Sequence, residues 1–352
     1  MRLLVCLLLV LLIGCNGAPP AQAEGPAGEN EAATEQPEAG ADQEATGGED
    51  EPTGLTSKLT TYFDANLAWG HLVHQVNLGF RVPGTSAHRT CRRWLEAELG
   101  KYCEEVFLQE FERVLPPDHK SVKMWNVIGR IDPEAERRIL LVAHWDTRPT
   151  ADYNPPGQQD QPIAGANDGA SGVAVLLELA RVFSEVPPPV GIDFLLTDGE
   201  DYGPGTTTMF MGAEHFADSL GISQVRSYNY GILLDMIGDK QLDIHPEHHS
   251  EGNSGRIYAV AFEVSRALGY LAFKEGGGYR ITDDHIALLE RGIKIYDFID
   301  FNYDYWHTTE DTVDKCSRDS LEAVGRTVEN MIYLFPEIYS PDDKGPSRRN
   351  PR

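Results

Sequence analysis

The chain has 352 residues, of which 41% are hydrophobic and 24% charged, so it is long enough to bury a sizeable core. Its formal net charge is -25, and ten of its acidic residues lie between residues 16 and 55. The remainder is still strongly acidic, which excludes nucleic acid as the main partner.

The N-terminus has the pattern of a bacterial lipoprotein signal peptide. An uncharged apolar stretch at 3–14 ends in "LIGC", with Cys15 last. The stretch is too short to span a bilayer, and a small residue before the cysteine suits cleavage and lipidation of the thiol. A buried N-terminal helix is the alternative. We expect 1–15 to be a signal peptide and the exported chain to be anchored to a bacterial membrane through Cys15, with Asn16 favouring the periplasmic face of the outer membrane.

The segment 16–55 is rich in Ala, Gly, Glu and Pro and has no Lys or Arg. It cannot bury enough apolar surface to offset the entropy of ordering it, so we expect a disordered acidic tether, or a filler without a role. Residues 56–338 are expected to form a single catalytic α/β domain, and 339–352 a flexible polar tail. Three cysteines lie in that domain, and one disulfide among Cys91, Cys103 and Cys316 is possible in an oxidising compartment, with Cys91 and Cys103 as the candidate pair.

In chain order, 58–77 is predicted to be helical, 78–85 is rich in turn residues, and 86–99 is again helical. Short apolar runs then alternate with longer amphipathic ones, at 139–143, 170–183, 191–197, 230–236, 255–268, 293–299 and 321–334. This alternation predicts an α/β fold of three layers, with a mixed and largely parallel central β-sheet flanked by helices. The small residues of "GANDGASG", which precede the helix at 170–183, permit a close approach of backbones.

Polar residues follow four of these apolar runs. They are His144, the segment 198–201, Asp235 and the segment 301–307. Functional groups of open α/β sheets gather where loops leave the carboxyl ends of strands. We therefore expect the four groups to meet at one edge of the sheet.

The residue types at this edge suit zinc, which takes three or four nitrogen and oxygen ligands and keeps a position open for catalysis. Asp168, Asp201 and His307 could supply three ligands. His144 and Asp235 would complete a second site, with Asp168 as the bridge, if two metals bind.

Two further acidic residues have expected roles near the metal. Asp146 could accept the other N–H of the His144 imidazole, and Glu200, next to a ligand position, could act as the general base. Each of these residues alone is more often a surface carboxylate or a helix cap. Together they indicate a metal site, because uncompensated carboxylates beside apolar strands are costly.

Three other features keep two interpretations each. Residues 283–285 precede an apolar run and could simply cap a helix. The aromatic residues of 301–306 could pack in the core or line a pocket. The polar loop 152–162 could border the site or be a solvated insertion.

On seven segments the chain resembles the zinc aminopeptidase-like superfamily, and within it the glutaminyl cyclases of bacterial type. The resemblance extends over nearly all of 55–336, and several matched segments in the right order are far more specific than one short motif. The segments are "FRVPGTSAH" from Phe80, "AHWDTRP" from Ala143, "GANDGASGVAVLLELAR" from Gly165, "TDGEDYG" from Thr197, "LLDMIGD" from Leu233, "DDHI" from Asp283 and "YWHTTEDT" from Tyr305.

The resemblance implies cyclisation of N-terminal glutaminyl residues of peptides or proteins to pyroglutamate, with loss of ammonia. It also implies one zinc ion, held by Asp168, Asp201 and His307, and makes Glu200 the proton shuttle. By the same correspondence, Asp235 and Asp284 belong to an acidic hydrogen-bond network with Glu200, and Trp306 and Asp283 border the substrate pocket.

The chain departs from the animal cyclases at three points. Asp201 is a Glu there, and a substrate-lining Trp is absent where this chain reads "YGPGTTTMF", so the second wall of the pocket is unassigned. Ala287 replaces the usual Pro after "DDHI".

Two other functions remain open. A two-zinc aminopeptidase would need the five ligands His144, Asp168, Asp201, Asp235 and His307, and all are present. An inactive lipid-anchored binding protein of the same fold is the second alternative, although such proteins typically lose the base or a ligand.

Overall fold

The computed structural model describes residues 55–339. The expected signal peptide, nearly all of the tether and the polar tail from residue 340 lie outside the described residues, and the predicted domain bounds stay a prediction. None of the helices within 55–339 has the length and apolar character needed to cross a membrane.

Four neighbouring strands of a six-stranded sheet with the order β1-β2-β4-β3-β5-β6 run parallel to one another. They are β3 (Arg138–His144), β4 (Gly191–Thr197), β5 (Tyr228–Asp235) and β6 (Ile295–Ile299). Every residue of these strands is buried, which fits their continuous apolar sequences. The four runs predicted as strands are therefore confirmed.

The remaining two strands form an antiparallel hairpin at one edge, β1 (Glu105–Leu115) and β2 (Lys120–Ile131), and β2 pairs antiparallel with β4. The hairpin makes the sheet mixed. The sequence does not predict this hairpin, because β1 mixes charged and apolar residues along the edge of the sheet. Only Phe111 and Leu115 of β1 are buried.

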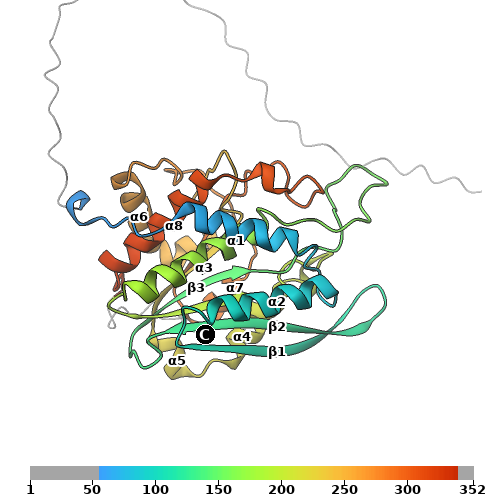
Figure 1. The fold of residues 1–352 in the computed structure, drawn as a ribbon, viewed down its shortest axis with the longest axis horizontal. Coiled ribbons are helices and arrows are strands. Elements are labelled where there is room, and N and C mark those ends of the chain that lie inside the picture. Colours follow the sequence, from blue (N-terminus) through green and yellow to red (C-terminus); the bar gives the residue numbers. More distant parts are fainter. Residues whose placement is uncertain (1–54, 340–352) are drawn as a thin grey trace, which may run out of the picture. The chain divides into compact units, whose positions relative to one another are not determined.

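Helices cover both faces of the sheet, as the predicted three layers require (Figure 1). One face carries α1 (Ala65–Asn77), α2 (Ser86–Leu99), α3 (Ala170–Glu185), α6 (His248–Ala267) and α8 (Arg318–Leu334). The other carries α4 (Met211–Ser219), α5 (Ile222–Ser227) and α7 (His285–Arg291). Short 3-10 turns lie at Thr56–Lys58, Thr206–Thr208 and Val313–Lys315.

The side chains of strand β3 pack against the helices on both faces of the sheet. Ile139, Leu141 and Ala143 pack into the core beneath α1 and α3, whereas Leu140 and Val142 pack into the core beneath α4 and α7. Successive side chains of a strand point to opposite faces, so an unbroken apolar run is buried on both sides.

Two helices begin at different residues from those predicted. α1 begins at Ala65 rather than near 58, because the Asp64 side chain accepts a 2.8 Å hydrogen bond from the Asn66 N–H and caps it. α6 begins at His248 rather than near 255. Glu247 caps it by accepting from the N–H groups of His249 (2.8 Å) and Ser250 (2.6 Å).

The close backbone approach expected at "GANDGASG" is confirmed. Gly172, in the first turn of α3, lies against β5, and a Cβ at this position would be 2.1 Å from the carbonyl oxygen of Leu234. Only glycine lets the helix pack this near the strand.

The disulfide that the sequence left possible is not formed, because Cys91, Cys103 and Cys316 are all free thiols. Cys91 lies in the middle of α2 and Cys103 beyond its end. The helix rises by about 12 Å from Cys91 to Leu99, and the Cys103 N–H donates to the Leu99 carbonyl (2.8 Å), which keeps Cys103 at the far end of the helix, beyond the Cα separation that a disulfide spans. Burial raises the pKa of both Cys91 and Cys103 to about 12.

Candidate active site

Three predicted metal ligands meet at the carboxyl edge of the parallel strands. Asp168 lies just before α3, Asp201 follows β4, and His307 lies in the loop after β6. The His307 Nε2 atom is 3.2 Å from Asp201 Oδ1 and 3.7 Å from Asp168 Oδ2. Ligand atoms around a tetrahedral zinc ion are about 3.3 Å apart, given bonds of about 2.0 Å. The spacing therefore suits a zinc ion among the three side chains.

The hydrogen bonding of these ligands also leaves room for a cation. Asp168 Oδ2 and Asp201 Oδ2 are buried and have no hydrogen-bond partner within the described residues. An uncompensated buried carboxylate oxygen is costly, and a metal ion would remove that cost. The donor set, one imidazole and two carboxylates with space for a substrate atom, is of the catalytic zinc type.

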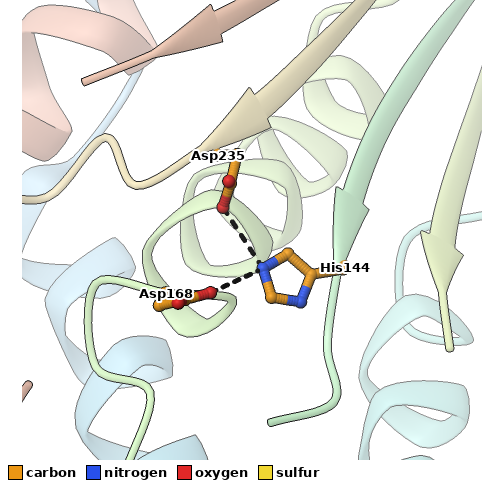
Figure 2. Close-up of side chains that lie close together, drawn as sticks. All are labelled: His144, Asp168 and Asp235. Carbon is orange, nitrogen blue, oxygen red and sulfur yellow. Dashed lines mark hydrogen bonds and ion pairs between the residues drawn. The ribbon is translucent and has the colours of Figure 1, made fainter. Parts of the chain in front are cut away.

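A second predicted set lies beside the first. The His144 Nε2 atom, at the end of β3, is 3.1 Å from Asp168 Oδ1 and 3.2 Å from Asp235 Oδ1, at the end of β5 (Figure 2). The two oxygens of Asp168 therefore face different histidines, His144 and His307. This arrangement suits either a second metal bridged by Asp168 or an imidazole N–H shared between two carboxylates.

Asp146 does not have the predicted role. Its Oδ1 lies 3.7 Å from His144 Nδ1, too far for a hydrogen bond. Its two oxygens instead accept from the backbone N–H groups of Glu200 (3.1 Å) and Asp201 (3.2 Å). Asp146 thus orients the turn that carries the base and a ligand.

Glu200 lies in the same pocket as the metal ligands, with its Oε2 3.7 Å from His144 Nδ1. Burial raises the pKa of Glu200 well above its usual value, and the carboxylates of Asp201, Asp283 and Asp284 raise it further, against the opposing effect of His144. Burial opposes a charge on His144, but the carboxylates around it raise the pKa of this imidazole well above its usual value. Glu200 therefore has the environment of a proton-transferring group.

The two acidic residues of "DDHI" are placed differently. Asp283 lines the pocket, as predicted, and burial raises its pKa to about 7. Asp284 precedes α7 but makes no side-chain cap, so the interpretation of this residue as a helix cap is wrong. Its Oδ2 accepts a 2.5 Å hydrogen bond from the Thr197 hydroxyl, and its Oδ1 has no partner among the described residues. The proposed network with Glu200 and Asp235 stays a prediction.

The inner pocket has a volume of about 40 Å³ and contains Glu200 and the three ligands. Its apolar walls are Trp306, as predicted, and Met209, Ile281 and Phe301, which supply the wall that the sequence analysis left unassigned. A vestibule of about 470 Å³ opens beside it, and the two cavities share six residues, Met209, Ile281, Thr282, Phe301, Trp306 and His307.

Loop 152–162 borders the site rather than standing apart from it. The Tyr153 ring packs on Trp306 with 4.8 Å between ring centroids, and its N–H donates to the carbonyl of His307 (3.2 Å). Trp306 in turn stacks on the His307 imidazole at 4.0 Å. The Asn154 side chain exchanges hydrogen bonds with Thr309. The loop therefore supports the segment that carries Trp306 and His307.

Arg148 is a site residue that the sequence analysis missed. Its Nη1 donates to Asp201 Oδ1 (2.7 Å), and its Nη2 donates to Asp152 Oδ2 (2.6 Å). The motif "AHWDTRP" was recognised, but nothing in the sequence shows which ligand its arginine reaches.

Arg81 and His88, both within "FRVPGTSAH", also position the site. Arg81 is fully buried and donates to the carbonyls of Trp145 (2.9 Å) and Gly165 (2.7 Å), which joins the loops that follow His144 and precede Asp168. His88 Nε2 lies 2.9 Å from both oxygens of Asp198, in the turn before Glu200. The residues of this motif therefore hold these loops together.

The comparisons with known proteins agree with this geometry. The model of peptidase family M28 matches residues 126–332. The chain belongs to this family. Among curated relatives, it is 26% identical to aminopeptidase YwaD of Bacillus subtilis, over 59% of this chain and 44% of that protein, so it spans less than half of the relative's length. It is 23% identical to the glutaminyl-peptide cyclotransferase of Bothrops jararaca, over 79% and 83%.

Solved structures of similar proteins include bacterial glutaminyl cyclases and zinc-dependent exopeptidases. The glutaminyl cyclase of Bacteroides thetaiotaomicron bound to N-acetylhistamine has 35% identity and a TM-score of 0.74, over 78% of this chain and 99% of that one. A Zn-dependent exopeptidase from Parabacteroides distasonis has 34% identity and a TM-score of 0.74, over 78% and 99%. Within the M28 family, the chain is of the bacterial glutaminyl cyclase type, as the sequence resemblance indicated.

Proposed function

We propose that this protein is a zinc-dependent glutaminyl-peptide cyclotransferase, an acyltransferase that converts N-terminal glutaminyl residues of peptides or proteins to pyroglutamate and releases ammonia. The observation that carries the proposal is the 35% identity over 99% of a solved bacterial glutaminyl cyclase. The pocket supports it, because the acid Glu200 and the expected metal ligands line the same small cavity.

Asp168, Asp201 and His307 would hold one zinc ion, since a carboxylate oxygen of each Asp lies 3.2–3.7 Å from the His307 imidazole and each carboxylate also has a buried oxygen without a partner among the described residues. A bound zinc ion supplies a Lewis acid that polarises the carbonyl of the substrate's side-chain amide. Arg148 limits the freedom of the Asp201 carboxylate, whose side chain is one methylene shorter than the Glu of animal cyclases.

Glu200 carries the proton transfers. It takes a proton from the substrate's α-amine while the amine nitrogen forms a bond to the side-chain amide carbon. It then donates this proton to the departing amide nitrogen as that carbon–nitrogen bond breaks, so ammonia leaves and the five-membered lactam remains. Burial and the neighbouring carboxylates raise the pKa of Glu200 well above its usual value, which favours its protonated form after the first transfer.

Trp306 and Phe301 orient the substrate. Their rings lie 4.9 Å apart between centroids, and both line the inner pocket beside His307. A glutamine side chain held against this aromatic wall with its α-amine near Glu200 is preorganised for ring closure, which is intramolecular and requires no water as nucleophile.

A two-zinc aminopeptidase is the second candidate, and one observation favours it. His144, Asp168 and Asp235 form a set in which ligand atoms lie 3.1 and 3.2 Å apart, as close as those of the first set. In the cyclase, His144 would instead donate its Nε2 proton to these carboxylates, and Asp235 would stay in the acidic network with Glu200 and Asp284.

Metal content and products together test the proposal. The purified protein should contain one zinc ion per chain and release ammonia from a glutaminyl peptide with formation of the lactam, and a chelator should stop the reaction. Two zinc ions per chain together with release of leucine from a leucyl amide would contradict it. The absence of both reactions would favour the inactive binding protein.

We also propose that the protein acts outside the cytoplasm, anchored through lipidated Cys15 to a bacterial membrane, with the acidic segment 16–55 as the tether. The support is the sequence alone, since an apolar stretch of signal-peptide length ends in "LIGC". Labelling with a fatty-acid analogue in a bacterial host should modify the wild type but not Cys15→Ala. Equal labelling of both would contradict the anchor.

A further inference from the structure

The vestibule is the place where a substrate continues beyond its first residue. This inference rests on the proposed function, which puts the N-terminal glutamine in the inner pocket beside Glu200. The six residues shared by the two cavities make the vestibule the adjoining space, so the residue that follows the glutamine enters it. Neighbouring residues of an extended chain are about 3.3–3.6 Å apart along its axis, and the side chain of the second residue therefore lies within this cavity.

Besides His307, the vestibule contains three charged side chains, and only one of them is available to a ligand. Arg148 and Asp152 form an ion pair of 2.6 Å, and Arg148 also binds Asp201. Arg280 is exposed at the same cavity. Its side chain contacts the His249 imidazole, with 3.2 Å between Nη1 and Nδ1, and no carboxylate within residues 55–339 forms an ion pair with it.

The backbone on both sides of Arg280 is fixed to the start of α6. The N–H of Tyr279 donates to the carbonyl of Pro246 (3.1 Å), and the N–H of Ile281 donates to Glu247 Oε1 (3.2 Å). His249, in the first turn of the same helix, holds the guanidinium. Arg280 is therefore a cation held at the vestibule before substrate arrives, which lowers the entropy cost of using it for recognition.

We propose that Arg280 forms a binding subsite for the carboxylate of the second substrate residue, so that peptides beginning Gln-Glu or Gln-Asp are the preferred substrates. The rings of Tyr153 and Tyr279 provide apolar walls for the methylene groups of that residue. A guanidinium offers several donors to a carboxylate, and the other charged groups of the vestibule are already paired.

The test compares peptides that differ only at the second residue, for example Gln-Glu-Ala-amide, Gln-Gln-Ala-amide and Gln-Lys-Ala-amide, with the full-length protein. The amide removes the terminal carboxylate as a competing anion. We expect kcat/KM to be about two- to fivefold higher for the Glu peptide than for the Gln peptide, the range of an exposed ion pair. The preference should decrease as salt is added.

In Arg280→Gln the ratio of kcat/KM for the Glu and Gln peptides should fall to about one, and in Arg280→Glu the Lys peptide should become the better substrate. Arg93→Gln is the matched control, since it removes an exposed arginine of α2 that lines none of these cavities, and it should leave the ratio at its wild-type value. An unchanged ratio in Arg280→Gln, or an equal loss for all three peptides, would overturn the proposal. Absence of cyclisation of every peptide by the wild type would instead contradict the proposed function itself.

Discussion

Arg148 donates a 2.7 Å hydrogen bond from Nη1 to Oδ1 of Asp201, the proposed zinc ligand that is shorter than its counterpart in animal cyclases. The same guanidinium binds Asp152 through Nε and Nη2, at 2.8 and 2.6 Å. The loop that borders the site and the carboxylate that would bind the metal are therefore oriented by one side chain. Replacement of Arg148 should therefore weaken metal binding more than it destabilises the fold.

Arg148→Gln should weaken zinc binding by about 10- to 100-fold, the usual effect of removing a partner that orients a metal ligand. Competition with a chromophoric chelator measures this affinity. Arg148→Lys keeps the charge but cannot reach both carboxylates, so an intermediate value is expected. Wild-type affinity in Arg148→Gln would show that Asp201 needs no such support.

Glu200→Gln should lower kcat for cyclisation by about 10²- to 10⁴-fold, because the amide cannot accept the proton of the α-amine. The zinc content should stay at the wild-type value, since Glu200 is not one of the three proposed ligands. Glu214→Gln changes an exposed glutamate of α4 and should have wild-type kinetics. Full activity of the Glu200 variant would remove this residue from the mechanism.

Gly172→Ala should destabilise the fold by about 1–3 kcal/mol, because its methyl group would meet the backbone of Leu234 at 2.1 Å and force α3 away from β5. Gly252→Ala is the matched change in α6, where a Cβ meets nothing within 4 Å. It should be neutral or stabilising by up to about 1 kcal/mol. Urea unfolding measures both, and equal effects would show that the close contact has no energetic weight.

The lowered pKa of Glu247 predicts that the stability of the fold depends on pH. Burial opposes its charge, but the His285 imidazole at 3.2 Å and hydrogen bonds from the N–H groups at the start of α6 lower its pKa from 4.5 to about 2. A carboxylate whose pKa is lower in the folded than in the unfolded state stabilises the fold at pH values above its unfolded pKa, here 4.5. For Glu247 this contribution is about 3 kcal/mol, and it is lost as the pH falls from 4.5 towards 2.

Glu247→Gln should therefore be less stable than the wild type at pH 7, and the difference in unfolding free energy should shrink as the pH approaches 2. Urea titrations at several pH values measure it. A difference that stays constant from pH 7 to pH 3 would rule out ionisation of Glu247 as its cause.

The sequence predicted the parallel centre of the sheet because both faces of those strands are buried, so their apolar runs are continuous. It did not predict the β1–β2 hairpin, whose outer strand β1 mixes charged and apolar residues and is mostly not buried, or the first turns of α6, which are polar and depend on the Glu247 cap. Asp168, Asp201, Asp235, His144 and His307 could be grouped in advance, because strand ends of a parallel sheet meet at one edge.

Other features of the site could not be predicted, because they depend on side-chain direction. Asp146 lies two residues from His144 yet binds the backbone of Glu200 and Asp201. Asp284 turns to Thr197, whereas its neighbour Asp283 faces the pocket. A sequence gives the spacing of such residues along the chain, but not which of two neighbours points into a cavity.

The most direct test of the proposed function is to react the purified protein with a glutaminyl peptide in H₂¹⁸O and determine the product mass. Intramolecular attack by the α-amine predicts a product that has lost ammonia, contains no ¹⁸O and fails to form when a chelator is present. Incorporation of ¹⁸O, either into a glutamyl peptide or into free glutamine released from a shortened peptide, would show that water is the nucleophile and would contradict the cyclase mechanism.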